Sequence, residues 1–141
     1  MKVMMFGKAT QQTEASQPPT EEALLAMQKF NEELEKAGVL LDLGGLTPTS
    51  RGVRVQYSGS KRTVIDGPFP ETKELIAGFW IWRVKSLQEA IEWVRRCPQT
   101  EGVDSEIEIR PVFEAEDFGS ELTPELRAQE DRLRTEIEKQ R

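Results

Sequence analysis

One nearly uninterrupted apolar run constrains the fold more than any other part of the sequence. Residues 75–84 read LIAGFWIWRV, so a strand here would carry apolar side chains on both faces. Such a strand belongs in the middle of a sheet, where both faces are covered. Successive side chains of a strand point to opposite faces, so Trp80 and Trp82 share one face and Phe79 and Ile81 share the other. The run therefore predicts a central strand with cover on both sides.

Two helices are predicted from caps and from helical spacing of apolar residues. Thr20 is a good N-cap for a helix over residues 20–37, and Gly38 follows as its stop. Ser86 and Glu89 form a capping box for a second helix over residues 86–97, which Pro98 ends. The sequence before the first helix, residues 8–19, is polar and is expected to be a loop.

The remaining segments complete an α+β pattern. Short strands are expected at residues 2–6, 39–46 and 106–113, and residues 52–58 and 62–65 are expected to pair as an inserted β-hairpin. The order is that of a ferredoxin-like β-α-β-β-α-β fold with this hairpin inserted. Both helices then cover one face of the sheet, and we expect a second copy of the chain to cover the other face.

A third helix is predicted after the last strand. Thr123-Pro124 provides an N-cap and a proline at the first helical position. Leu126, Leu133 and Ile137 give this helix a thin apolar seam, and we expect it to dock along that seam on its own subunit or on the partner. From Glu114 onward there are nine acidic and five basic residues, so this region is strongly acidic.

Composition excludes several classes of function. The 141 residues carry a net charge of −6, which disfavours nucleic-acid binding. Histidine is absent, which excludes a Ser-His-Asp triad and a His-based metal site. Cys97 is the single cysteine, which fits a reducing cytoplasm. No stretch is long enough to span a membrane, and no signal peptide, phosphate loop or dinucleotide fingerprint is visible. We therefore expect a cytoplasmic protein with no cofactor, metal, nucleic-acid or membrane partner.

Asp66 is the best candidate for a catalytic group. It precedes Gly67-Pro68 and a loop that leads directly into the central strand. The simpler interpretation is a turn residue whose carboxylate accepts hydrogen bonds from backbone N–H groups of its own loop. The alternative is a pocket acid or base whose pKa is raised by burial. Lys73, with Glu74 beside it, is a candidate for binding an anion or a solvated loop charge.

Other candidates for ligand binding lie on the hairpin, the first helix and the central strand. Arg54 and Arg62 belong to a stretch between Asp42 and Asp66 that contains no acidic residue. This stretch could attract a small anion, contact the acidic tail or serve as a charged sheet edge. Asn31 is near enough to the sheet side of its helix to line a pocket. Trp80 and Trp82 are either core packing, which we favour, or an aromatic wall for a flat ligand.

These segments resemble a known family. Asp66-Gly67-Pro68-Phe69, preceded by residues 61–65 and followed by Glu71, Lys73-Glu74 and Ala77-Gly78, is similar to the DGPF domain, a branch of the YCII-related proteins. Further similar stretches are residues 30–34, 45–48, 89–93, 107–110 and 116–118. The resemblance covers residues 1–118, which we expect to form the domain, with residues 119–141 as a helical extension. It implies a dimeric α/β barrel built from two ferredoxin-like units.

The resemblance also bears on function. Some YCII relatives are thought to work as lyases or isomerases through a His–Asp pair, with the histidine on the helix that corresponds to residues 20–27, where this chain has none. We therefore expect a homodimeric small-molecule-binding protein for a small anionic or aromatic ligand, with at most weak acid–base activity. The alternative is a non-catalytic regulatory or interaction module, because many DGPF proteins are encoded beside sigma factors.

Overall fold

The chain forms two compact units. The computed structural model describes every residue, Met1–Arg141. The first unit comprises Met1–Pro111 and contains all the strands, and the second comprises Val112–Arg141.

The centre of the first unit is a four-stranded antiparallel sheet. Its strand order is β2-β5-β1-β6. The bounds are Lys2–Lys8 for β1, Leu40–Gly45 for β2, Ile76–Arg83 for β5 and Ile107–Pro111 for β6. This order confirms the predicted ferredoxin-like arrangement. It also confirms that the apolar run forms a central strand, because β5 lies between β2 and β1.

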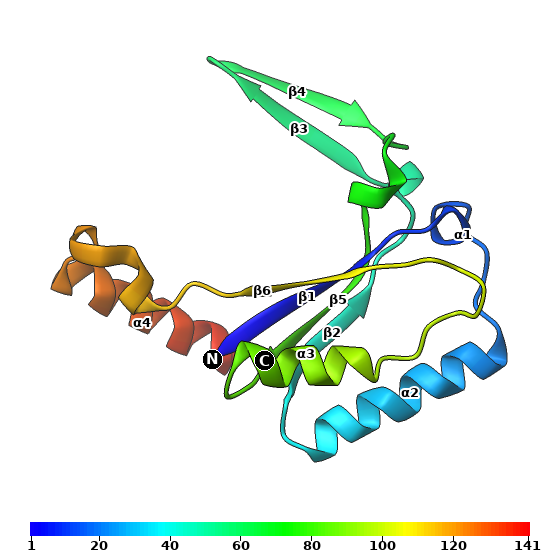
Figure 1. The fold of residues 1–141 in the computed structure, drawn as a ribbon. Helices are drawn as coiled ribbons and strands as arrows, with labels where there is room; N and C mark the ends of the chain where they lie inside the picture. Colours follow the sequence, from blue (N-terminus) through cyan, green and yellow to red (C-terminus); the bar gives the residue numbers. More distant parts are fainter. The chain divides into compact units, whose positions relative to one another are not determined.

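Helices α2 (Glu21–Lys36) and α3 (Leu87–Arg95) cover the same face of this sheet (Figure 1). The Thr20 Oγ1 accepts a hydrogen bond from the Ala23 N–H at 3.1 Å, so α2 begins where its cap was predicted. The Ser86 Oγ likewise accepts from the Glu89 N–H at 3.2 Å. The Glu89 carboxylate, however, accepts from the Lys85 N–H at 2.7 Å and not from the cap residue itself.

The expected polar loop before α2 contains one helical turn, α1 (Gln11–Glu14). Thr10 and Thr13 cap it reciprocally: the Thr13 N–H donates to the Thr10 Oγ1 at 3.2 Å, and the Thr10 N–H donates to the Thr13 Oγ1 at 2.8 Å. These two bonds satisfy backbone donors that a short helix leaves free. The turn positions Glu14, which becomes important for the site.

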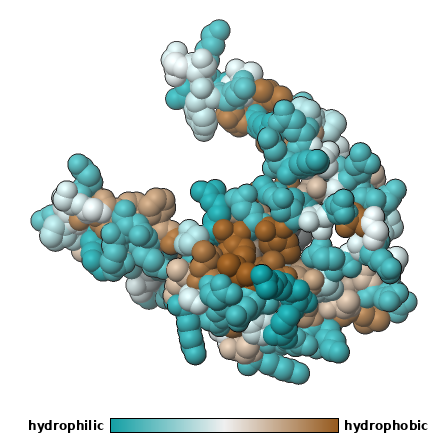
Figure 2. Space-filling view, viewed as in Figure 1, coloured by the Kyte–Doolittle hydropathy of each residue, from teal (hydrophilic) through white to brown (hydrophobic).

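The core lies between the sheet and the two helices. Val3, Met5, Leu34 and Trp82 are fully buried there. The Phe30 ring meets its aromatic neighbours edge-on, with centroid distances of 6.3 Å to Trp80, 6.4 Å to Trp82 and 6.4 Å to Trp93. Such edge-to-face contacts stabilise beyond the area they bury. In Figure 2, hydrophobic residues gather in the middle of the first unit, at the level of the sheet.

The other face of the sheet is not covered by any helix of the first unit. Strand register pairs Met4 with Ile81 and Phe6 with Phe79. These residues alternate along β1 and β5 with the buried core residues, so their side chains lie on the opposite, open face of the sheet. These four apolar side chains are partly buried. Gly44 lies opposite Phe79 in the register, and a Cβ at Gly44 would lie 2.7 Å from that ring. The open face therefore carries an apolar stripe along β1 and β5.

The inserted hairpin forms a separate two-stranded sheet. Strands β3 (Val53–Ser58) and β4 (Lys61–Asp66) pair with each other and have no hydrogen-bonded neighbour in the larger sheet. We call this hairpin the arm. In Figure 1 it projects from the sheet on the side opposite to α2 and α3.

The second unit consists of a 3₁₀ segment, Ala115–Glu121, and helix α4 (Pro124–Lys139). The Thr123 Oγ1 accepts from the Leu126 N–H at 3.3 Å, which confirms the predicted cap. The seam residues Leu126, Leu133 and Ile137 are 47, 57 and 49% exposed. Docking along this seam stays a prediction. No helix of either unit is both long enough and apolar enough to cross a membrane.

Candidate functional site

The loop that joins the arm to β5 is held by a threonine from a distant turn. Thr49 opens a short 3₁₀ helix, Thr49–Arg51, just before the arm. Its Oγ1 accepts a hydrogen bond from the Phe69 N–H at 3.1 Å and donates one to the Glu14 carboxylate at 2.6 Å. The Thr49 N–H also donates to that carboxylate, at 3.1 Å. Three segments far apart in sequence thus meet at one hydroxyl.

The backbone of Gly67 lies so close to the Thr49–Arg51 turn that a residue with a Cβ atom would not fit there. Its N–H donates to the Gly52 carbonyl oxygen at 2.9 Å, and the peptide bond to Pro68 is cis. A Cβ on Gly67 would lie 1.7 Å from the carbonyl oxygen of Thr49. That is far inside van der Waals contact, so the glycine of the Asp66–Phe69 motif is required for close backbone packing.

The predicted role of Asp66 as the hydrogen-bond acceptor of its own loop is wrong. Asp66 is the exposed last residue of β4, and its carboxylate accepts no hydrogen bond within the chain. The Gly67 N–H is taken by Gly52 and the Phe69 N–H by Thr49. The acceptors for this loop come from the turn before the arm, because that turn packs directly against Gly67.

Beside this loop, a cation lies over an aromatic ring and interacts with one of two neighbouring carboxyl groups. The Arg54 guanidinium lies over the Phe69 ring at 3.9 Å from its centroid. Glu71 has a left-handed backbone with φ of 65° and opens the short 3₁₀ helix Thr72–Glu74. A hydrogen bond with Glu74 and the negative charge of Glu74 raise the pKa of Glu71, with a smaller increase from desolvation, and the Arg54 charge lowers it.

This arrangement places a carboxyl group with a raised pKa beside a planar donor. Two carboxyl groups that share a hydrogen bond retain a proton more easily than a single carboxylate does. A guanidinium stacked on a ring keeps its N–H groups in a plane that suits a carboxylate or phosphate. We call Arg54, Phe69, Glu71 and Glu74 the arm-base cluster. No group of three or more His, Cys, Asp or Glu side chains is placed to hold a metal ion.

The predicted candidates do not all meet at this cluster. Arg54 belongs to it, and Lys73 is exposed between Glu71 and Glu74 in the sequence. Arg62 lies at the tip of the arm, where its guanidinium stacks on Tyr57 at 4.6 Å from the ring centroid. It also donates hydrogen bonds to the carbonyl oxygens of Gly59 and Lys61 at the tip.

Asn31 and the two tryptophans lie on the helical side of the sheet. The Asn31 Oδ1 accepts a hydrogen bond from the Trp80 Nε1 at 2.9 Å. Trp80 is 9% exposed and Trp82 is fully buried, so both rings pack in the core, as the favoured interpretation expected. The Trp82 Nε1 has no hydrogen-bond partner. A fully buried Trp82 cannot serve as the wall of an open pocket in this chain.

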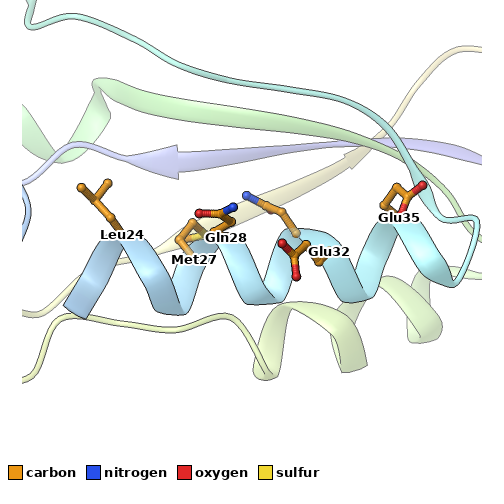
Figure 3. Close-up of a pocket in the computed structure, with 6 residues that line it drawn as sticks. Leu24, Met27, Gln28, Glu32 and Glu35 are labelled. Atoms are coloured by element: carbon orange, nitrogen blue, oxygen red, sulfur yellow. The ribbon is translucent and has the colours of Figure 1, made fainter. Parts of the chain in front are cut away.

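An open groove runs along α2 where Asn31 lies. The residues that line it are Leu24, Met27, Gln28, Asn31, Glu32 and Glu35 (Figure 3). Along α2 they follow one another at alternating intervals of three residues and one residue, so they share one face of the helix. The groove is apolar at its N-terminal end and acidic at its C-terminal end. We call it the α2 groove.

The sequence did not single out Glu14, Thr49 or the Glu71–Glu74 pair. The partners of the Glu14–Thr49 hydrogen bond are 35 residues apart in the sequence, and those of the Thr49–Phe69 hydrogen bond are 20 apart. No local spacing could therefore indicate either contact. The glutamate pair did carry a signal. Glu71 and Glu74 are three residues apart, and one helical turn places such residues side by side.

Comparison with known proteins finds a sequence relative and similar solved structures. An uncharacterized protein of Rhizobium meliloti (strain 1021) is 34% identical over 77 residues, which are 55% of this chain and 62% of that protein. The match thus spans less than two thirds of that relative. The structure of 5-chloro-2-hydroxyhydroquinone dehydrochlorinase from Burkholderia phenoliruptrix AC1100, in complex with 2,5-dihydroxybenzoquinone, aligns with a TM-score of 0.47 at 15% identity. That alignment covers 83% of this chain and 98% of the other.

The family is shown by a sequence model. The model of the YCII-related domain matches residues 1–116, which include the whole sheet, helices α2 and α3, the arm and the arm-base cluster. The chain therefore belongs to the YCII-related family.

Proposed function

We propose that this protein is a homodimeric small-molecule-binding protein whose ligand binds at the arm-base cluster, with at most weak acid–base activity there. The observation that carries the proposal is the Arg54 guanidinium stacked on Phe69 beside Glu71. In a chain without histidine, acid–base chemistry falls to groups such as Glu71, whose pKa is raised by Glu74.

The homodimer is supported by the open face of the sheet. Helices α2 and α3 both cover the opposite face, and Met4, Phe6, Phe79 and Ile81 stand on the open one. A contiguous apolar stripe of this kind on a sheet calls for a cover. A second copy provides one by packing sheet against sheet, and about 800 Å² per subunit suffices for a stable interface.

The ligand chemistry follows from the groups at the cluster. Arg54 offers paired donors to a carboxylate or phosphate, and the exposed Lys73 adds a second positive charge nearby in the chain. The half-buried Phe69 ring under this guanidinium adds an aromatic surface to the cluster. A small aromatic carboxylate combines the features that these groups recognise.

The test is a thermal-shift screen of small carboxylates and phosphates, with benzoate and inorganic phosphate as first probes. A ligand at about 100 times its dissociation constant adds about 2.7 kcal/mol of stability, which raises the melting temperature measurably. We expect Arg54→Gln to abolish the shift. Arg95→Gln is the matched control, because Arg95 is exposed in the last turn of α3, on the opposite side of the sheet from the arm, and it should keep the shift.

Two results would contradict the proposed site. A ligand whose shift survives in Arg54→Gln binds elsewhere. A screen in which no carboxylate or phosphate raises the melting temperature would favour the alternative, a non-catalytic interaction module. For that alternative, the exposed apolar seam of α4 is the supporting observation, because Leu126, Leu133 and Ile137 are each about half exposed.

A further inference from the structure

The arm presents an apolar face that nothing in the first unit covers. Strand register pairs Val55 with Val64 and Tyr57 with Arg62, so these side chains share one face of the arm with Val53. Their exposed fractions are 59% for Val53, 47% for Val55, 73% for Tyr57 and 64% for Val64. An isolated two-stranded hairpin is marginally stable in water. The arm therefore needs a partner surface to hold its shape.

The α2 groove has the complementary composition. Its N-terminal end contains Leu24 and Met27, and Leu24 is 56% exposed. Its C-terminal end contains Glu32 and Glu35, neither of which forms an ion pair within the chain. The arm tip offers the opposite charge in Arg62, which shares one face of the arm with Tyr57, the single aromatic residue of the arm.

The direction of the arm decides which copy of the groove it can reach. The arm projects from the open face, away from its own α2 (Figure 1). Each arm strand has six residues and is about 20 Å long at about 3.3 Å per residue. In a dimer with sheets face to face, the partner's sheet lies about 10 Å away and its helices lie behind that sheet. An arm of this length passes the partner's sheet and extends to its helix layer.

We propose that the tip of the arm docks in the α2 groove of a second copy of the chain, with Tyr57 against Leu24 and Met27 and with Arg62 facing Glu32 and Glu35. This inference rests on the proposed homodimer and adds a second contact to it. Tyr57 supplies rigid contact area at little cost in side-chain entropy, as tyrosine commonly does at interfaces. The stacked guanidinium of Arg62 is already oriented on the arm before docking.

A charge-reversal cycle tests the polar half of this contact. Arg62→Glu and Glu35→Arg are each expected to weaken the dimer about tenfold in sedimentation equilibrium, since like charges would then face each other across the interface. The double variant Arg62→Glu/Glu35→Arg restores the opposite pairing and is expected to recover most of that loss. Lys85→Glu, an exposed charge reversal just before α3, is the matched control and should leave the dissociation constant unchanged.

A disulfide trap tests the same contact by distance. The natural Cys97 is buried, and burial raises the pKa of its thiol to about 11, so it stays unreactive near neutral pH. Tyr57→Cys/Leu24→Cys is expected to form a covalent dimer under mild oxidation. Tyr57→Cys/Leu87→Cys, with the second thiol on an exposed site of α3, should not.

The outcomes separate this inference from the proposed homodimer. A wild-type chain that sediments as a monomer overturns both. A stable wild-type dimer that Arg62→Glu and Glu35→Arg leave unchanged, with no covalent dimer from the Tyr57–Leu24 pair, overturns the arm contact alone. A disulfide formed within one chain would show that the arm folds back onto its own α2, which also contradicts the inference.

Discussion

Gly67→Ala is expected to destabilise the protein by about 3 kcal/mol or more, as severe overpacking does. The added Cβ would lie 1.7 Å from the Thr49 carbonyl oxygen and 2.6 Å from its carbonyl carbon, and backbone atoms cannot rotate away as a flexible side chain can. The loop would have to separate from the turn, which would break the hydrogen bond from the Phe69 N–H to the Thr49 Oγ1. Urea unfolding at one fixed protein concentration measures the change.

Gly45→Ala is the matched control for this variant. A Cβ on Gly45 would have no atom within 4 Å, and its backbone is that of an ordinary strand residue. Its stability should stay within about 0.5 kcal/mol of the original protein. Equal stability of the two variants would show that the close approach of Gly67 to Thr49 does not exist in solution.

Phe30→Ala is expected to cost about 3–5 kcal/mol, the usual loss when a buried aromatic residue is truncated. Phe30 is 4% exposed, and its ring contacts Trp80, Trp82 and Trp93, so its removal leaves a cavity lined by three indoles. Tryptophan fluorescence reports both the loss of stability and the change around these rings.

Leu25→Ala on the same helix is the control for the aromatic core. Leu25 is 59% exposed, so truncation should cost less than about 1 kcal/mol. A Phe30→Ala variant as stable as Leu25→Ala would mean that α2 does not pack on the sheet through this ring.

Local patterns in the sequence were sufficient to predict the strands, the three longer helices and their order, but not the single turn of α1. Thr20 and Ser86 cap their helices as predicted because an N-cap acts on the next three residues only. The run that became β5 indicated a central strand because its two faces are both apolar. The side chains of β5 alternate between the two faces of the sheet as predicted, with Trp80 and Trp82 in the core and Phe79 and Ile81 on the open face.

The arm-base cluster could be predicted only in part, since its contacts are non-local. Asp66 attracted attention because Asp-Gly-Pro sequences form turns through their own side chains. The actual acceptor is Thr49, 20 residues before Phe69, and Thr49 is in turn held by Glu14 on α1. Arg54 was a candidate for its charge, but its position over Phe69 depends on how the arm leaves the sheet. Neither contact has a signature in residue spacing.

The mass of the native protein in solution decides whether the proposed homodimer exists, and both the ligand site and the arm contact are proposed for that homodimer. Each chain weighs 16.1 kDa. Light scattering on the full chain at micromolar concentration is expected to give twice that mass, with Met4, Phe6, Phe79 and Ile81 buried between the two sheets. A mass of one chain across the whole concentration range would show that the two sheets do not pack against each other in solution.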